Sequence, residues 1–192
     1  MPEPFGIAAG LIAQRTGLAA VFTGDAGEAG LIEQARAQMG GAPVSAAAAT
    51  MAAASASAFA AGAMSVPLAG ALDLGGLAAL IAGAERVVSN NTGPAHLAAA
   101  IGTPVVALYA LTNPQHTPWR ARSAMLSHDV PCRNCLKSAC PGASASEGHH
   151  DCLRRVTPIQ VADAALALLA GKGVGSTAGP AAGQRSRPSA RG

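Results

Sequence analysis

The chain has 192 residues, of which 12% are charged and 3% aromatic, and its formal net charge is +3. This length fits one domain with a tail, and the spaced Leu, Ile and Val runs argue against a wholly disordered chain. Four basic residues and no acid lie beyond Gly171, so the preceding residues are slightly acidic overall. That distribution argues against a nucleic-acid partner, and the Gly-, Pro- and Ser-rich residues 171–192 predict a disordered basic tail.

The sequence shows neither a secretion signal nor a membrane span. Met1 to Pro4 is not basic and leads into no clean apolar stretch. The most apolar run, Leu97 to Leu111, is interrupted by Gly102 and Pro104 and is too short to span a bilayer. We therefore expect a cytoplasmic location.

The first third of the chain predicts two helices around one strand. Apolar residues at helical spacing from Phe5 to Ile12 predict a helix that Gly17 ends, and Leu18 to Thr23 predicts a buried strand. A second helix is expected from about Ala29 to Met39. Its predicted inward residues are Leu31, Ile32, Ala35 and Met39. Residues 41–63 are nearly all Ala, Ser, Gly and Met and form an insert of uncertain structure.

Strands and helices alternate more clearly from residue 65 on. Strands are predicted at 65–68, 86–89 and 105–110. Asp73 is the expected N-cap of a helix that ends at Gly83, with Leu77, Leu80 and Ile81 inward. A turn at 90–93 leads into a helix with Pro94 at its first position and Gly102 at its end.

The last predicted element is a helix before Gly171. Thr157 and Gln160 form a capping box, and Pro158 takes the first helical position. The expected inward stripe is Val161, Ala164, Ala165 and Leu168. The alternation over the whole chain predicts an α/β fold, with one parallel sheet covered by helices on both faces. Such sheets bind ligands beyond the carboxyl ends of their strands, which here follow Thr23, Ser89 and Ala110.

The turn after the strand at 86–89 is the strongest candidate for a ligand site. Gly93 allows a ligand to approach the backbone closely, and the helix that follows presents unpaired N–H groups and its positive dipole end. The Thr92 hydroxyl and the His96 imidazole add hydrogen-bonding groups, which together suit a phosphate or diphosphate. In the alternative interpretation, Asn91 and Thr92 only cap the helix and His96 is partly buried.

The turn after the first strand offers a carboxylate. Glu28 could hold two ribose hydroxyls, as acidic residues do in dinucleotide-binding folds, or could only complement the dipole of the next helix.

The segment from Ser89 to Tyr109 closely resembles the signature of glycosyltransferase family 9, the ADP-heptose:lipopolysaccharide heptosyltransferases and their relatives. Ala110 to Trp119 looks like the loop that follows this signature, and the resemblance covers about residues 2–170. It implies one half of a GT-B fold, in which two Rossmann-like domains enclose the active site. Residues 1–170 resemble the C-terminal, donor-binding half, with its first strand and donor-phosphate lysine missing.

The resemblance also implies roles for individual residues. Glu28 corresponds to the acid that holds the adenosine ribose, and Leu72 lies near the position that packs on the adenine. The segment that meets the diphosphate and sugar contains Asn91, Thr92, Gly93, Pro94 and His96. Asn91 departs from the pattern, since the best-known members have Asp there; a neutral amide repels a diphosphate less but cannot act as a base.

The implied reaction is inverting transfer of a sugar from an ADP-sugar, such as an ADP-heptose-like donor, to a hydroxyl of a lipid-linked or glycan acceptor. Thr92, Gly93 and His96 would stabilise the leaving diphosphate, while the general base would lie on the absent domain. No cofactor is required, and contact with the cytoplasmic face of the inner membrane is expected. The alternative is a non-catalytic nucleotide-sugar-binding module, or a subunit completed by a separate N-terminal half.

The four cysteines, Cys132, Cys135, Cys140 and Cys152, lie in a segment at 128–155 that also holds His149 and His150. Their thiolates could bind a structural zinc ion, or they could be reduced thiols of a loop. Six basic residues lie between 120 and 155: Arg120, Arg122, Arg133, Lys137, Arg154 and Arg155. They could meet an anionic acceptor or a membrane surface, or form a solvated face.

Overall fold

The computed structural model describes residues 2–39, 65–109, 117–118, 121–128, 130 and 151–171. In chain order the elements are α1 (Glu3–Thr16), β1 (Ala20–Gly24), the 3-10 turn η1 (Ala26–Glu28), α2 (Ala29–Met39), β2 (Ser65–Ala69), α4 (Leu74–Gly83), β3 (Val87–Asn90), α5 (Gly93–Ile101), β4 (Val105–Leu108), β5 (Ser123–Leu126), α6 (Asp151–Arg154) and α7 (Pro158–Leu169). The predicted insert at 41–63 and the tail beyond Gly171 lie outside these residues.

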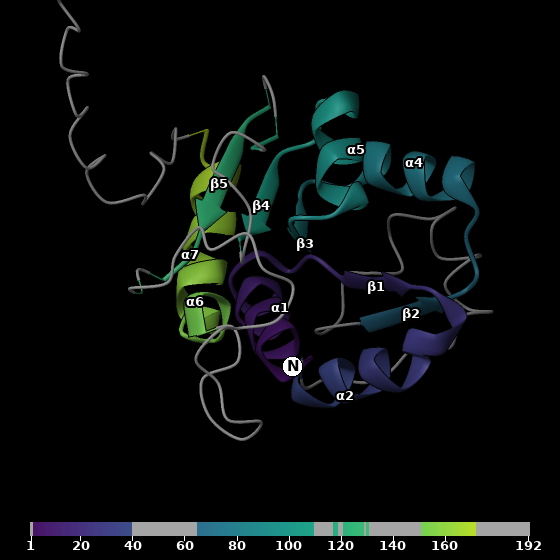
Figure 1. The fold of residues 1–192 in the computed structure, drawn as a ribbon, viewed down its shortest axis with the longest axis horizontal. Helices are drawn as coiled ribbons and strands as arrows, with labels where there is room; N and C mark the ends of the chain where they lie inside the picture. Colours follow the sequence, from purple (N-terminus) through teal and green to yellow (C-terminus); the bar gives the residue numbers. More distant parts are fainter. Residues whose placement is uncertain are drawn as a thin grey trace, which may run out of the picture.

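The strands form two parallel sheets instead of the single one expected. β1 pairs with β2, while β3, β4 and β5 form a separate ladder in that order. Across Figure 1 the strands follow one another as β5, β4, β3, β1 and β2, so the two sheets face each other through β3 and β1. The prediction of an α/β fold with parallel strands is confirmed, and within the described residues these strands form two ladders.

The three-stranded sheet lies between two layers of helices. Along β4, Val106 and Leu108 pack in one cluster with Ala8 of α1 and the inner face of α7. Val105 and Ala107 point to the other face, where they pack with Ile81 of α4 and with α5. All four β4 residues are buried, as expected of a parallel strand covered on both faces.

Two burial predictions in the first third of the chain are wrong. β1 alternates between half-buried and exposed residues, with Val21 40% exposed, so it is not a buried strand. Leu31 is 48% exposed, because α2 turns only Ile32, Ala35 and Met39 inward.

The predicted helix ends agree with the structure except at one residue. Gly17 and Gly102 adopt the left-handed conformation that ends α1 and α5. Thr157 and Gln160 form the expected capping box. Pro94 is the second residue of α5, not the first, because the helix begins at Gly93.

Two short elements carried no clear sequence signal. β5 has four residues, and α6 is a single turn that buries Cys152. The backbone N–H of His128 donates to the carbonyl of Cys152 over 2.7 Å, which joins the segment after β5 to α6. Within the described ranges, no helix combines the length and the apolar character needed to cross a bilayer.

α1 and α2 cross so closely that glycine is required at the contact. A Cβ atom on Gly6 would overlap the Ala35 carbonyl, and one on Gly10 would lie 2.6 Å from the Met39 oxygen. A backbone carbonyl cannot move aside as a flexible side chain can. The two glycines therefore set the distance between these helices.

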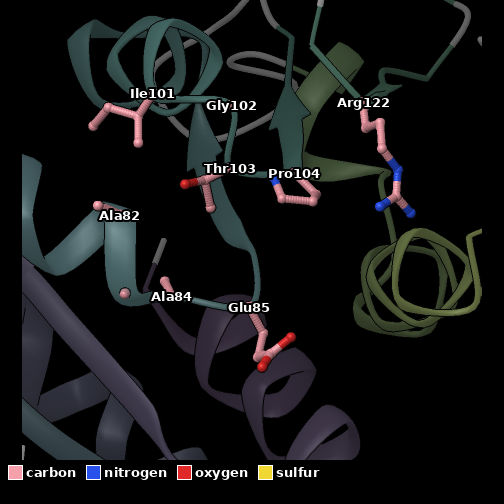
Figure 2. A pocket seen from close by; sticks show the side chains of 9 residues that line it. Ala82, Ala84, Glu85, Ile101, Gly102, Thr103, Pro104 and Arg122 are labelled. Atoms are coloured by element: carbon pink, nitrogen blue, oxygen red, sulfur yellow. The ribbon is translucent and has the colours of Figure 1, made fainter.

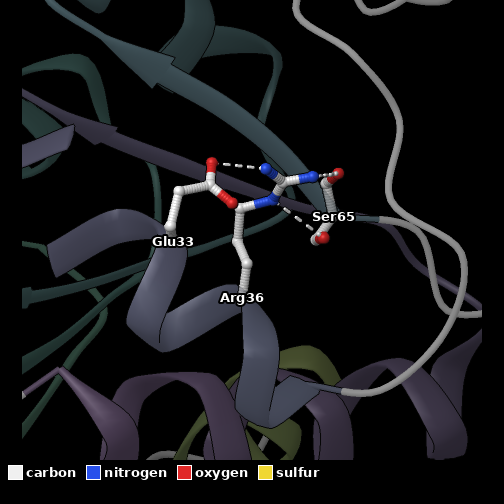
Figure 3. A network of polar contacts seen from close by, with 3 residues as sticks. All are labelled: Glu33, Arg36 and Ser65. Carbon is white, nitrogen blue, oxygen red and sulfur yellow. Dashed lines mark hydrogen bonds and ion pairs between the residues drawn. The ribbon is translucent and has the colours of Figure 1, made fainter. Parts of the chain in front are cut away.

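A polar network joins α2 to the start of β2 (Figure 3). The Arg36 Nε donates to the Ser65 hydroxyl over 3.1 Å, and its Nη1 forms an ion pair of 2.6 Å with Glu33. The Arg36 side chain is only 9% exposed, so these acceptors compensate for its loss of hydration. The network fixes the first residue of β2 against α2.

Replacement of Gly6 by alanine should lower the free energy of unfolding by about 1–3 kcal/mol, because α1 and α2 must separate to admit the methyl group. Gly30→Ala is a matched control: Gly30 also lies in a helix, but a Cβ there meets nothing within 4 Å. The control should be neutral or stabilising by up to about 1 kcal/mol. Urea unfolding measures both variants, and equal stability of the two would contradict the close crossing.

Candidate nucleotide site

The loops that follow β1 and β2 lie against each other at the carboxyl edge of their sheet. The backbone N–H of Gly70 donates to the Gly24 carbonyl over 2.8 Å. Gly70 has a φ of +60°, and a Cβ there would lie 2.9 Å from the Ala26 Cβ. The loop that carries Glu28 and the loop that carries Leu72 are thus held side by side.

Glu28 is held in a fixed orientation at this edge. Its carboxylate accepts a hydrogen bond of 3.0 Å from the Asp25 N–H, while Asp25 accepts one of 3.1 Å from the Glu28 N–H. Gly24 leaves room for this arrangement, since a Cβ there would lie 2.6 Å from a Glu28 oxygen. Glu28 is exposed, so it caps the turn and still presents a carboxylate to solvent.

Leu72 and Leu74 flank the start of α4 at the same edge. Leu72 is half-buried and lies against Gly76, while Leu74 is 73% exposed. Asp73 between them caps α4 by accepting a 2.7 Å hydrogen bond from the Gly76 N–H. The cap fixes the direction in which the helix, and with it both leucines, leaves the loop.

The first turn of α5 is fixed to the three-stranded sheet from two sides. The backbone N–H of Asn91 donates to the Leu108 carbonyl over 2.9 Å, which extends the β3–β4 ladder past the end of β3. Behind the turn, Ala95 is completely buried in the cluster that contains Tyr109. The turn at 91–95 therefore cannot shift without disturbing the sheet.

Thr92, the N-cap residue of α5, forms no side-chain cap hydrogen bond with this first turn. Thr92 has the extended backbone of an N-cap, but its hydroxyl donates to the Asn90 carbonyl over 3.3 Å. By contrast, Asp25, Asp73 and Thr157 each accept a hydrogen bond from an N–H three residues later. The α5 N-terminus therefore lacks the side-chain cap that these three helices have, and the positive end of its dipole can act on a group from outside the helix.

The three residues that would touch a ligand here are all accessible. Thr92, Gly93 and His96 are exposed, and a Cβ on Gly93 would meet nothing within 4 Å. Gly93 also lacks a positive φ, so the fold itself gives no reason for glycine at this position. The alternative interpretation is therefore wrong in two respects, since the Thr92 side chain does not cap the helix and His96 is exposed. A cap by Asn91 stays untested, and the phosphate interpretation stays a prediction.

α4 and α5 pack together through Ile81 and Ala98, and their last residues line one pocket. Each helix follows the carboxyl end of a parallel strand, β2 for α4 and β3 for α5. Leu72 and Asn91 therefore each follow the carboxyl end of a strand, as Glu28 does after β1.

Tyr109 supports the site and was not singled out from the sequence. It follows β4, is 7% exposed, and packs in the same cluster as Ala95 and Ala98. Burial raises the pKa of its hydroxyl above the ordinary value, so the phenol is uncharged at neutral pH. The only sequence signal was its place at the end of a buried strand.

A separate pocket lies at the opposite, amino edge of the sheet (Figure 2). It has a volume of about 440 Å³ and lies between the last residues of α4 and α5, with Glu85, Thr103 and Arg122 in its lining. Ligands of parallel α/β sheets bind at the carboxyl edge, so this pocket is not the nucleotide site.

Two arginines near this amino edge hold the end of α7. Arg86 donates to the Ala165 carbonyl over 3.3 Å, and Arg122 donates to the Leu168 carbonyl. Burial lowers the pKa of Arg86, and the nearby Glu85 carboxylate opposes this change. Both side chains complement the negative end of the helix dipole.

The structure describes three of the six basic residues predicted to cluster between 120 and 155. Arg122 is bonded to α7, and Arg155 forms an ion pair of 3.0 Å with Asp151. Arg154 is exposed, whereas Arg120, Arg133 and Lys137 lie outside the described residues. Contact of these basic residues with an anionic acceptor or a membrane surface stays a prediction.

The zinc hypothesis is also left open. Cys132, Cys135 and Cys140 lie outside the described residues, and Cys152 is a buried free thiol. In the part of the chain that the structure covers, no group of three or more His, Cys, Asp or Glu side chains could hold a metal.

Comparisons with known proteins give one consistent result. The sequence profile of glycosyltransferase family 9 (heptosyltransferase) matches residues 38–145, which is more than half of the chain. Lipopolysaccharide heptosyltransferase 1 of Pseudomonas aeruginosa is 36% identical over 108 residues, covering 51% of this chain and 30% of that protein. Lipopolysaccharide heptosyltransferase 2 of Escherichia coli is 33% identical over 102 residues, covering 53% of this chain and 28% of that protein. The chain thus matches less than a third of the length of these relatives.

Two solved structures have a similar fold. The ADP-heptose lipopolysaccharide heptosyltransferase II of Escherichia coli gives a TM-score of 0.58 at 24% identity. A family 9 glycosyltransferase of Veillonella parvula gives 0.63 at 23% identity. The alignments cover 88% and 90% of this chain but only 42% of each neighbour. At this identity they bear on the fold alone, and they confirm the expected Rossmann-like part of a GT-B enzyme.

The contrast between capped and uncapped helices can be tested by paired substitutions. Asp73→Ala should lower the free energy of unfolding by about 1 kcal/mol, because the Gly76 N–H loses its acceptor. Thr92→Ala should change it by less than about 0.5 kcal/mol, because the Thr92 hydroxyl does not cap α5. Urea unfolding of the ligand-free protein compares the two, and a cost at Thr92 equal to that at Asp73 would contradict the geometry.

Proposed function

The chain belongs to glycosyltransferase family 9, and we propose that it binds the nucleotide-sugar donor of a lipopolysaccharide heptosyltransferase-like enzyme. The proposed donor is an ADP-sugar, and the proposed acceptor is a hydroxyl of a lipid-linked or glycan substrate. The proposal is supported by the names of the similar proteins, which are lipopolysaccharide heptosyltransferases, and by the polar groups at the carboxyl edge described above.

The observation that carries the proposal is the exposed, uncapped first turn of α5. It combines a positive dipole end, a Gly93 N–H without a side-chain cap and two exposed polar side chains, Thr92 and His96. Each of these groups favours an anion with several oxygen atoms, and a diphosphate is such an anion. A side chain at position 93 would stand where that anion must approach.

The other loops would hold the nucleoside. The fixed Glu28 carboxylate can accept hydrogen bonds from both hydroxyls of a ribose. Leu72, with the exposed Leu74 beside it, offers an apolar surface for the base. A nucleoside diphosphate placed along this edge would extend from Glu28 toward His96.

The chemistry proposed for this site is stabilisation of the leaving group. In the transfer, an acceptor oxygen forms a bond to the anomeric carbon while the bond from that carbon to the diphosphate oxygen breaks. The electron pair leaves with the diphosphate, where the α5 dipole and the donors of Gly93, Thr92 and His96 would meet the new negative charge. A general base for the acceptor proton would come from the part of the enzyme that these residues do not form.

Calorimetric titration with ADP tests the site. The unmodified chain should bind ADP, and Glu28→Gln, His96→Ala and Gly93→Val should each weaken binding about tenfold or more. Glu28→Gln and His96→Ala should each remove one charge-assisted hydrogen bond to ADP. The Gly93→Val side chain should block the approach of the diphosphate to the backbone. Gly93→Val should remain folded, because open space surrounds that position.

Glu33→Gln provides the matched control for Glu28→Gln. Glu33 lies in α2, the helix that follows Glu28, and its side chain is exposed. It forms an ion pair with Arg36, away from the carboxyl edge of the strands. Its replacement should leave ADP binding unchanged. Undiminished binding in all three site variants would show that ADP binds elsewhere or that the proposed site is wrong.

A further inference from the structure

The helices of this chain differ in the cations at their C-terminal ends. The last carbonyl groups of an α-helix lack partners within it and lie at the negative end of the helix dipole, which favours a cation there. α1, α2 and α6 each have an arginine in the last turn: Arg15, Arg36 and Arg154. α7 has none there, but its carbonyls accept hydrogen bonds from Arg86 and Arg122. Within the described residues, neither kind of cationic partner is found at the end of α4 or α5.

The two helix ends without a cation meet at one cavity, the amino-edge pocket of Figure 2. The pocket has a volume of about 440 Å³. Ala82, Gly83 and Ala84 line it at the end of α4, and Ile101 and Gly102 line it at the end of α5. Because both helices end at the same cavity, the negative ends of their dipoles add to one another there.

The sheet uses the N–H groups that would otherwise continue these two helices. The N–H of Val87, four residues after Gly83, donates over 2.8 Å to the carbonyl of Pro104, just ahead of β4. The N–H of Val105, four residues after Ile101, donates over 3.0 Å to the residue ahead of β5. The carbonyl groups of Gly83 and Ile101 therefore lose their usual helical donors and remain as acceptors at the helix ends.

The side chains of the pocket add further acceptors. Thr103 is 6% exposed, and its hydroxyl donates to the Ile81 carbonyl over 2.8 Å, so toward the pocket its oxygen can only accept. Glu85 is exposed and adds a carboxylate. The described lining has one basic side chain, Arg122, but its guanidinium extends toward α7 and donates to the Leu168 carbonyl (Figure 2). A ligand that suits this pocket must therefore bring N–H donors and a positive charge.

We propose that the amino-edge pocket is a binding site for a small guanidinium compound. A guanidinium group is planar and positively charged, and its several N–H donors can bond two acceptors at once. Arg86 and Arg122 use the same group to hold the carbonyls of α7 at this edge. The bound cation would bridge the ends of α4 and α5, and the Glu85 carboxylate would complement its charge. The site does not depend on the proposed function, because the nucleotide loops follow the opposite ends of the strands.

The probe for this site is butylguanidine, which is protonated at neutral pH, and its control is butylurea, which has a similar shape but no charge. Backbone amides of the isotope-labelled chain are followed by nuclear magnetic resonance during titration with each compound. Butylguanidine should give saturable shift changes at Gly83, Glu85, Gly102 and Thr103, and butylurea should not. Sodium chloride at the same concentration measures the effect of ionic strength. Equal changes with butylurea or with salt, or changes confined to other residues, would overturn the proposal.

Gly83→Lys supplies a cation from the chain itself. A Cβ at Gly83 meets nothing within 4 Å and the residue has no positive φ, so the variant should fold. Its ammonium group should occupy the pocket and weaken butylguanidine binding about tenfold or more by charge repulsion. Gly30→Lys adds the same charge at another helical glycine with open space around it, and it should leave the affinity unchanged. Equal affinities of the two variants would contradict the site.

Glu85→Gln tests the carboxylate without adding any bulk. It should weaken butylguanidine binding about threefold or more, because the neutral amide no longer attracts the cation. Glu33→Gln removes the same charge from an exposed residue of α2 and should have no effect. Undiminished binding in Glu85→Gln would count against the proposal.

ADP titration of the unmodified chain is a separate measurement. Loss of ADP binding with retained butylguanidine binding would contradict only the proposed function. Retained ADP binding without butylguanidine binding would contradict only the guanidinium site.

Discussion

The attachment of the first turn of α5 to the three-stranded sheet is the constraint on which the candidate site depends. The hydrogen bond from the Asn91 N–H to the Leu108 carbonyl holds the turn from the front, and the completely buried Ala95 holds it from behind. A helix N-terminus held in this way keeps its dipole and N–H groups oriented before a ligand arrives. Such preorganisation lowers the cost of binding an anion and of stabilising charge that develops on it.

The second constraint is the distribution of helix caps. Asp25, Asp73 and Thr157 satisfy the N–H groups of their own helices, and these caps contribute to the stability of the fold. Thr92 instead turns its hydroxyl to the Asn90 carbonyl. The capped termini thus stabilise the fold, whereas the terminus without the Thr92 side-chain cap is the one at which ligand binding is proposed.

Much of the fold could be predicted from the sequence, because the signals were local. Gly17 and Gly102 mark helix ends, the Thr157 and Gln160 pair marks a helix start, and each mark is confirmed. β5 escaped prediction because four residues carry too little periodicity. The exposure of Leu31 and the division of the sheet escaped prediction because both depend on which elements become neighbours in space.

In the candidate site, too, the features with a local sequence signal were predicted and those that depend on contacts in space were not. The turn at 90–93 was predicted from the strand at 86–89 and from the Gly93-Pro94 pair that follows it, and the structure shows Thr92, Gly93 and His96 exposed after the carboxyl end of β3. The absence of a side-chain cap on α5 could not be predicted, since Thr92 is a residue type that commonly caps helices. The fixed Glu28 carboxylate and the support from Tyr109 likewise depend on three-dimensional contacts.

The candidate site lies next to the break between the two sheets. Both candidate loops, that of Glu28 and that of α5, follow the two strands that border the break between the sheets. In open α/β sheets the ligand crevice forms beyond the carboxyl ends of the strands, and both loops lie there. The pocket between α4 and α5 lies instead at the amino ends of the strands, where neither candidate loop is found.

The most direct test of the account is a nuclear magnetic resonance titration of the isotope-labelled chain with ADP, followed through the backbone amides. The account predicts that the largest shift changes occur at Gly93 and His96, with further changes at Asp25 and Glu28. Changes confined to residues of the amino-edge pocket, such as Glu85 and Thr103, or no changes at saturating ADP, would contradict it.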